Sequence, residues 1–139
     1  MKKLFLFAST AVLASTLFLA SCSKTEDPAA NPSSTDPRAR FLANWYIQEN
    51  SSDYGPSTYN VTVTDSSNSS YIMFAYLYGE SKKMYATYSG NNFTFPSQII
   101  AGKSFSGTGT LSNSSRIDMT YLVRISTSHY DTVRAVLTK

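Results

Sequence analysis

Apolar and polar residues alternate with a period of two along much of residues 45–138, which is the pattern of half-buried β-strands. The clearest run covers residues 116–124, where only Leu122 interrupts the polar face. Aromatic and β-branched residues, which pack well on pleated surfaces, supply most of the apolar positions. Further strand-like runs lie at residues 45–49, 61–64, 84–88, 92–95, 99–100, 104–111 and 132–138. The folded part of the chain is therefore predicted to be all-β.

Residues 71–78 have the sequence YIMFAYLY and are apolar or aromatic on both faces of the expected strand. Successive side chains of a strand point to opposite faces, so Phe74, Tyr76 and Tyr78 are expected to share one face. One face must line the core. The other face is either covered by a second layer or exposed as an apolar, tyrosine-bearing patch. Exposed patches of that kind tend to bind a ligand or a partner.

Clusters of Gly, Pro, Ser, Asn and Asp separate the runs, and residues 54–56 (Tyr-Gly-Pro) and 89–91 (Ser-Gly-Asn) are expected turns. One helical turn is expected at residues 37–42, with Asp36 as its N-cap and Pro37 as its first residue. Many short strands joined by short turns predict a small antiparallel up-and-down β-barrel, with a β-sandwich as the alternative. The barrel is favoured because closure removes the exposed edges that an apolar strand would make hazardous.

The first 21 residues are predicted to be a secretion signal, because two lysines precede an apolar run that is too short and too rich in Ser, Thr and Ala for a membrane span. The run ends at Leu19-Ala20-Ser21-Cys22, which resembles the bacterial lipobox. The resemblance implies that diacylglycerol is attached to the thiol of Cys22, that the chain is cleaved before Cys22, and that the new amine is acylated. We therefore expect a lipoprotein that is held at a membrane through lipid on Cys22.

Residues 22–37 are predicted to be a disordered tether, because nothing apolar larger than Ala occurs in residues 23–37. The acidic pair Glu26-Asp27 resembles the tags that export some lipoproteins to the outer leaflet. The expected location is thus the outer membrane of the cell envelope, with the periplasmic and surface leaflets both open. Residues 38–139 are expected to form one all-β domain, which is long enough for its own core.

Net charge offers no support for nucleic-acid binding. Removal of Lys2 and Lys3 with the signal lowers the formal net charge from +3 to +1. The remaining basic residues form no stripe along the chain, whereas nucleic-acid-binding proteins carry a basic patch. Because Cys22 is the only cysteine, no intramolecular disulfide is possible either.

The turns and strands of nearly the whole domain follow a pattern that is known from one protein family. The matching stretches lie at residues 36–38 leading to Trp45, and at 85–98, 105–111, 119–121 and 137–139. These stretches resemble a group of small Bacteroidetes lipoproteins described as lipocalin-like. The resemblance implies that Trp45 closes the floor of the barrel and that Arg134, or failing it Arg124, packs across the indole. The lipocalin Gly-x-Trp triplet reads Ala43-Asn44-Trp45 here, so its Gly is missing. The chain is also shorter than a typical lipocalin, and a small barrel fills with its own side chains.

Candidate catalytic chemistry centres on the single histidine. A Ser-His-Asp triad is recognised by geometry rather than order, which admits His129 and Asp131 as members. The chain has no Gly-x-Ser-x-Gly elbow, and His129 falls in an expected loop, so a solvated histidine is the favoured interpretation. No ligand-spaced cluster indicates a metal, and we expect no cofactor and no enzymatic activity. Two carboxylates across a cleft, or His129 bonded to a serine hydroxyl, would support an enzyme instead.

The abundance of aromatic residues, with 10 Tyr and 8 Phe, favours a binding function. The first hypothesis is a non-catalytic, lipid-anchored module for a small apolar ligand or a glycan. The ligand would contact a cavity lined by Phe74, Met119 and Tyr121, or an aromatic surface at Tyr76 and Tyr78. The alternative is a structural or protein-interaction lipoprotein, such as an inhibitor or an envelope assembly component, with a packed interior. A filled interior would rule out a lipocalin-style carrier.

Overall fold

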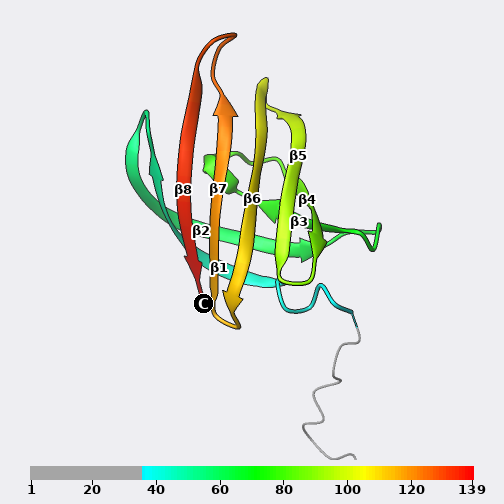
Figure 1. Ribbon diagram of the computed structural model, residues 1–139. Helices are drawn as coiled ribbons and strands as arrows, with labels where there is room; N and C mark the ends of the chain where they lie inside the picture. Colours follow the sequence, from blue (N-terminus) through cyan, green and yellow to red (C-terminus); the bar gives the residue numbers. More distant parts are fainter. Residues whose placement is uncertain (1–35) are drawn as a thin grey trace, which may run out of the picture. The chain divides into compact units, whose positions relative to one another are not determined.

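The computed structural model describes residues 36–139, so the predicted signal, Cys22 and nearly all of the predicted tether lie outside the described residues. Eight strands follow one another along the chain, and each pairs antiparallel with the next (Figure 1). They are β1 (Ala43–Ser51), β2 (Gly55–Asp65), β3 (Tyr71–Ala75), β4 (Met84–Ser89), β5 (Asn92–Ile100), β6 (Lys103–Asn113), β7 (Arg116–Arg124) and β8 (Tyr130–Thr138). Because β8 also pairs with β1, the sheet closes. The predicted up-and-down barrel is confirmed, and the sandwich alternative is wrong.

Strand boundaries differ from the expected ones where proline interrupts the alternation. The runs at residues 92–95 and 99–100 form one strand, β5, because a bulge between Phe95 and Gln98 absorbs the break around Pro96. The expected turn at residues 54–56 is shorter, since Gly55 and Pro56 already pair with β1. In β7 the alternation runs through the whole strand as predicted, with every second residue buried.

Aromatic side chains fill the middle of the barrel. The ring centroid of Phe74 lies 5.2 Å from that of Phe93 and 4.9 Å from that of Phe95. Phe74, Met119 and Tyr121 are buried and belong to the packed core, and in residues 36–139 no pocket inside the barrel is lined by the three together. The predicted apolar cavity at these three residues is therefore wrong for the part of the chain that the structure describes, because their own volume occupies the small barrel.

Two inward-facing glycines of β6 show how tight this packing is. A Cβ added at Gly107 would lie 2.5 Å from the Cβ of Tyr121. A Cβ added at Gly109 would collide with the ring of Phe93 and lie 2.8 Å from the Cβ of Met119. Glycine at these positions lets β6 approach the rings that cross the barrel.

Gly109→Ala is expected to lower the free energy of unfolding by about 1–3 kcal/mol, because the added methyl group overpacks a filled core. The matched control is Thr108→Ala, one residue away on the exposed face of the same strand. Urea unfolding followed by Trp45 fluorescence measures both. Equal stability of the two variants would contradict the packed interior.

Residues 36–42 close one end of the barrel, which we call the floor. The expected helical turn is present there only as successive hydrogen-bonded turns at residues 37–41. Phe41 and Trp45 are fully buried at the floor, and the indole Nε1 of Trp45 donates to the Phe41 carbonyl at 2.8 Å. Burial of Trp45 at the floor is thus as the family resemblance implied.

The cation that covers Trp45 is not the expected one. Lys139 Nζ lies 4.5 Å from the centroid of the Trp45 ring. Arg134 occupies an outward position of β8, and Arg124 an outward position of β7, so both are exposed and neither packs across the indole. The guanidinium that braces the floor belongs to Arg38, which donates to two carbonyls of the loop between β2 and β3 at 2.9 and 3.2 Å.

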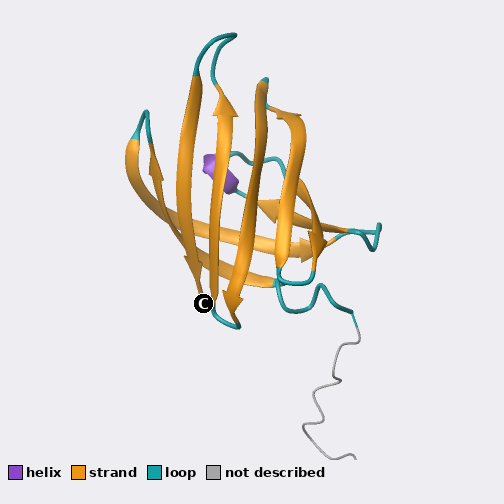
Figure 2. Cartoon of the chain, viewed as in Figure 1, coloured by secondary structure: helices purple, strands orange, loops and turns teal. Residues whose placement is uncertain are grey.

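The opposite end of the barrel, which we call the mouth, carries the connections β1–β2, β3–β4, β5–β6 and β7–β8. The connection between β3 and β4 contains η1 (Leu77–Gly79), a single short helical turn drawn in purple in Figure 2. No helix in residues 36–139 is long and apolar enough to cross a bilayer. The four mouth connections lie together because successive strands of an antiparallel meander reverse direction.

Candidate functional site

A pocket with a volume of about 290 Å³ lies at the mouth, and we call it the mouth pocket. Residues of β1, β2, their connection and η1 form its walls; they are Glu49, Ser51, Tyr54, Gly55, Ser57, Tyr59, Tyr78 and Gly79. Its volume is near the lower bound of about 300 Å³ for small-molecule sites. The pocket combines aromatic walls with carboxylate and hydroxyl groups.

Glu49 is the buried charged group of the mouth pocket. It follows Trp45 and Ile47 at the inward positions of β1, so the strand turns its carboxylate into the barrel, where the residue is 7% exposed. Ser57 donates to Oε1 at 2.9 Å, and Tyr59 and Tyr121 donate to Oε2 at 2.7 and 2.6 Å. Three hydroxyl donors from two other strands thus converge on this one side chain.

The two tyrosines beside Glu49 act as neutral donors. Burial raises the pKa of Tyr59 well above its ordinary value, and the hydrogen bond to Glu49 raises it further. Burial also raises the pKa of Tyr121, and its neighbours Tyr59 and Glu49 raise it further. Both hydroxyls therefore keep their protons at neutral pH and remain directed at the carboxylate.

Asp131 is a second buried carboxylate at the mouth, on β8. Its Oδ2 accepts from Ser51 at 2.6 Å and from Tyr78 at 2.7 Å, while Oδ1 accepts from Ser52 at 2.9 Å and from the Asp53 N–H at 3.3 Å. Burial alone would raise the pKa of Asp131, but these four hydrogen bonds outweigh it and lower the pKa below the ordinary value. Asp131 thereby ties β1, the β1–β2 connection and η1 to β8.

Tyr78 covers the mouth from η1. Its hydroxyl donates to Asp131, and its backbone N–H donates to the hydroxyl of Tyr59 at 2.7 Å. Lys103 Nζ lies 5.3 Å from the centroid of the Tyr78 ring and pairs with Glu80 at 2.8 Å. Side chains from three strands, β2, β6 and β8, thus hold this one residue in place.

The expectation that Tyr76 and Tyr78 share a strand face with Phe74 is wrong. The strand ends at Ala75, and the chain then adopts the left-handed conformation at Tyr76 (φ 69°) and at Tyr78 (φ 57°). Tyr76 consequently points outward and is 56% exposed, whereas Tyr78 lines the mouth pocket. Left-handed aromatic residues are strained, and strain of this kind clusters at ligand clamps.

Tyr76→Gly is expected to raise the free energy of unfolding by about 0.5–1 kcal/mol, because glycine adopts a positive φ without steric cost. Tyr54→Gly is the matched control, since Tyr54 is another exposed mouth tyrosine but has no positive φ. That control should lose stability. Chemical denaturation of both variants tests the strain, and a loss of stability in Tyr76→Gly would contradict it.

His129 lies at the mouth, in the connection between β7 and β8. Its Nε2 lies 2.6 Å from Oδ2 of Asp53, and the side chain is exposed. The hydroxyl of Ser51 bonds to Asp131 at 2.6 Å, and the hydroxyl of Ser52 lies 2.9 Å from Oδ1 of Asp131 and 3.4 Å from Oδ1 of Asp53. In the described residues His129 and Ser52 therefore share the carboxylate of Asp53, but His129 hydrogen-bonds to no serine hydroxyl there. No group of three or more His, Cys, Asp or Glu in these residues forms a metal site.

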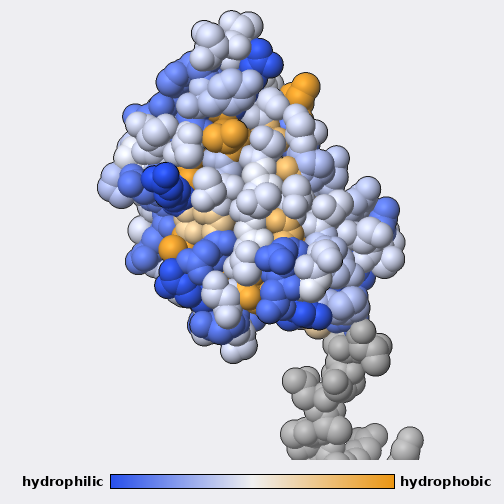
Figure 3. Space-filling view, viewed as in Figure 1, coloured by the Kyte–Doolittle hydropathy of each residue, from blue (hydrophilic) through white to orange (hydrophobic). Residues whose placement is uncertain are grey.

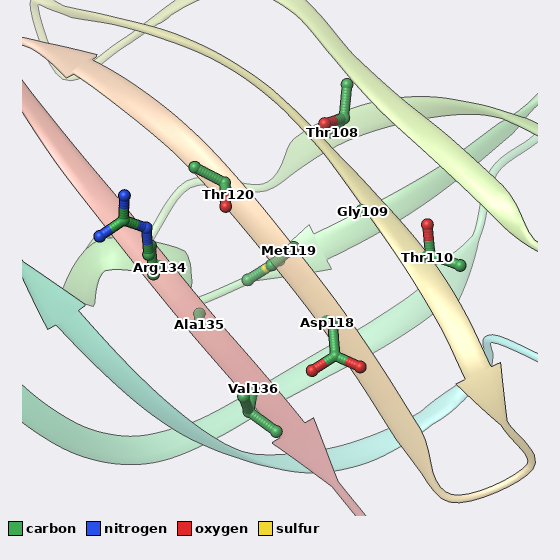
Figure 4. Close-up of a pocket in the computed structure, with 9 residues that line it drawn as sticks. All are labelled: Thr108, Gly109, Thr110, Asp118, Met119, Thr120, Arg134, Ala135 and Val136. Atoms are coloured by element: carbon green, nitrogen blue, oxygen red, sulfur yellow. The ribbon is translucent and has the colours of Figure 1, made fainter.

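A larger hollow of about 380 Å³ lies on the outer wall of β6, β7 and β8, and Figure 4 shows Thr120, Asp118 and Arg134 around it. None of its lining residues is a buried charged side chain. On the face of the molecule seen in Figure 3, apolar residues form small separate spots on a mostly polar surface. The mouth pocket is thus the stronger candidate, because a buried charge faces it.

The sequence pattern pointed to Tyr78 and Tyr121, but not to Glu49 as the acceptor for Tyr121 or to Asp131 as the acceptor for Tyr78. Glu49 carried a usable signal, because it lies at an inward position of a strand whose other inward residues are Trp45 and Ile47. Tyr59 and Asp131 carried the same kind of signal, since Tyr59 is in step with Val61 on β2 and Asp131 with Val133 on β8. Their roles depend on contacts between strands that are far apart in the sequence.

Comparison with known proteins adds information on the fold alone. No family model and no curated protein matches the chain. A solved structure of a redesigned β-barrel is similar, with a TM-score of 0.54 and 8% sequence identity over 75% of this chain and 95% of that one. At this identity the similarity supports the barrel architecture and carries no site residue across.

Proposed function

We propose that this protein is a lipid-anchored, non-catalytic binding module that holds a small ligand in the mouth pocket. The observation that carries the proposal is the buried carboxylate of Glu49 facing a pocket of about 290 Å³. Small-molecule sites typically combine a concave, partly aromatic wall with a few polar groups of this kind. The filled centre of the barrel moves the ligand site from the middle, as in a lipocalin-style carrier, to the mouth.

The anchoring part of the proposal rests on the lipobox resemblance of residues 19–22 and places the protein in the outer membrane. Two or more acyl chains on Cys22 would hold it stably without a spanning segment. We expect the mature protein to partition into the detergent phase and Cys22→Ala to remain an unprocessed precursor without lipid. Mass spectrometry of the mature N-terminus checks this, and an unmodified Cys22 in the processed chain would overturn it.

Two exposed tyrosines make a matched test of the pocket. Tyr54 lines the mouth pocket and is 71% exposed, whereas Tyr76 is exposed nearby but does not line it. Fragments screened by NMR against the full mature protein should shift the amides of residues 49–59 and 77–79. Tyr54→Ala should weaken these hits and Tyr76→Ala should not. A screen without hits at these amides, or equal effects of both variants, would contradict the proposal.

A protein-interaction role is the second candidate, favoured by exposed apolar residues outside the barrel. The packed interior fits it, and Ile99 is 76% exposed on β5. Leu122, Ile125 and Tyr130 are further exposed apolar residues on or beside β7 and β8. If this surface binds an envelope protein, Ile99→Asp should abolish one specific crosslink in cells that Tyr54→Ala leaves intact. Absence of any specific crosslink would remove this candidate.

A further inference from the structure

We infer that the mouth pocket selects a small organic cation, with its ammonium group hydrogen-bonded to Glu49 and its body against the tyrosine walls. This inference rests on the proposed function and names the chemical class of its ligand. Three features of the described residues support it: an uncompensated buried charge, a free acceptor position on Glu49, and aromatic rings around that position.

The buried charge at the mouth has no cationic partner. The acids that form ion pairs in residues 36–139 are Asp36, Asp53, Glu80 and Asp118. Glu49 takes part in none of these pairs and is stabilised by hydroxyl groups alone. A buried carboxylate without a counter-ion attracts a cation and repels an anion.

The two buried carboxylates differ in their remaining capacity. A carboxylate offers about four acceptor positions. Asp131 receives four hydrogen bonds, two on each oxygen, and is saturated. Glu49 receives three, and its Oε1 accepts only from Ser57. One position on Glu49 therefore remains for an N–H donor from the pocket, which makes Glu49 the ligand-facing acid and Asp131 the structural one.

Rings complete the site for a cation. Tyr54, Tyr59 and Tyr78 line the same pocket as Glu49, and the rings of Tyr54 and Tyr78 meet edge to face at 6.2 Å. Aromatic faces attract ammonium groups through the negative potential of their π-system. Lys103 of the chain itself already places its ammonium 5.3 Å from the Tyr78 ring. The walls thus suit a cationic body better than a neutral one.

The test compares benzylammonium with benzyl alcohol, which have the same shape but differ in charge at neutral pH. Both are titrated into the full mature protein, and the amides of residues 49–59 and 77–79 are followed by NMR. We expect benzylammonium to bind at least about tenfold more tightly than the alcohol, as for one charged hydrogen bond. Glu49→Gln should remove this preference. Asp118→Asn should keep it, since it changes the net charge equally but lies on the outer wall of the barrel, outside the lining of the mouth pocket.

A second variant keeps the test decisive if Glu49→Gln fails to fold. Tyr54→Leu leaves the buried network intact and should weaken benzylammonium more than benzyl alcohol. Equal affinity of the two probes, with no effect of Glu49→Gln, would overturn the cation inference while the binding function stands. If neither probe shifts the pocket amides at millimolar concentration, but neutral fragments of other shapes do, the inference fails alone. If no fragment shifts them, the binding function fails with it.

Discussion

Trp45→Ala is expected to lower the free energy of unfolding by about 3–5 kcal/mol, the largest effect of any single core substitution in this barrel. The indole is fully buried between the floor turns and the core. Its removal leaves a cavity, frees the Phe41 carbonyl from its hydrogen bond, and takes away the ring beneath Lys139. A loss of this size is a large part of the about 5–15 kcal/mol that stabilises a typical domain.

Tyr46→Ala is the control for this experiment. Tyr46 is the next residue of β1 but points outward and is 45% exposed, so its truncation should cost less than about 1 kcal/mol. Urea unfolding followed by far-ultraviolet circular dichroism suits both variants, because Trp45 is the only tryptophan and one variant lacks it. A loss below that of Tyr46→Ala would contradict closure of the floor by Trp45.

Asp131→Asn is expected to cost at least about 3 kcal/mol at neutral pH, because four donors then face an uncharged amide that brings donors of its own. The wild-type protein should also lose stability in acid. The pKa of folded Asp131 lies below the unfolded value of about 3.9, so its contribution is complete above about pH 5. That contribution is lost as the pH falls through the folded-state pKa, and Asp131→Asn should lack this part of the acid transition.

Asp118→Asn provides the matched control for acid unfolding. Hydrogen bonds from Arg116 and Ser112 also lower the pKa of Asp118, but that pair lies on the surface, where water screens it. Asp118→Asn should therefore change little how the free energy of unfolding falls at acid pH. Urea unfolding at a series of pH values compares the variants with the wild type. An acid limb in Asp131→Asn as steep as that of the wild type would show that Asp131 does not anchor the mouth.

Different interactions hold the two ends of the barrel. The floor is held by apolar burial around Trp45, which is insensitive to pH, and by the hydrogen bonds of Arg38 to the loop between β2 and β3. The mouth is held by hydroxyl groups around two carboxylates, and one of these, Asp131, also fixes Tyr78 over the pocket. Faster amide exchange at residues 76–79 in Asp131→Asn, with unchanged exchange at residues 41–45, would be the expected local signature.

The sequence by itself determined the strands and, for most of them, which residues point into the barrel and which point outward. In β7 the period-two pattern runs from Arg116 to Arg124 as predicted, because alternation depends only on which side of one strand is buried. Antiparallel meandering followed from the short connections, since short loops join only antiparallel neighbours. Closure as a barrel agreed with the need to hide the edges of apolar strands.

Only the tertiary structure decided the site. Tyr121 and Glu49 are separated by 72 positions, and Ser51 and Asp131 by 80, so no local pattern could pair them. Gly79 marks a turn here, but nothing local shows that the preceding Tyr76 and Tyr78 also take the left-handed conformation. Contacts of Tyr78 with Asp131 and Tyr59 hold that conformation. Alternation is a property of one strand, whereas a buried charge network depends on the registers of several strands at once.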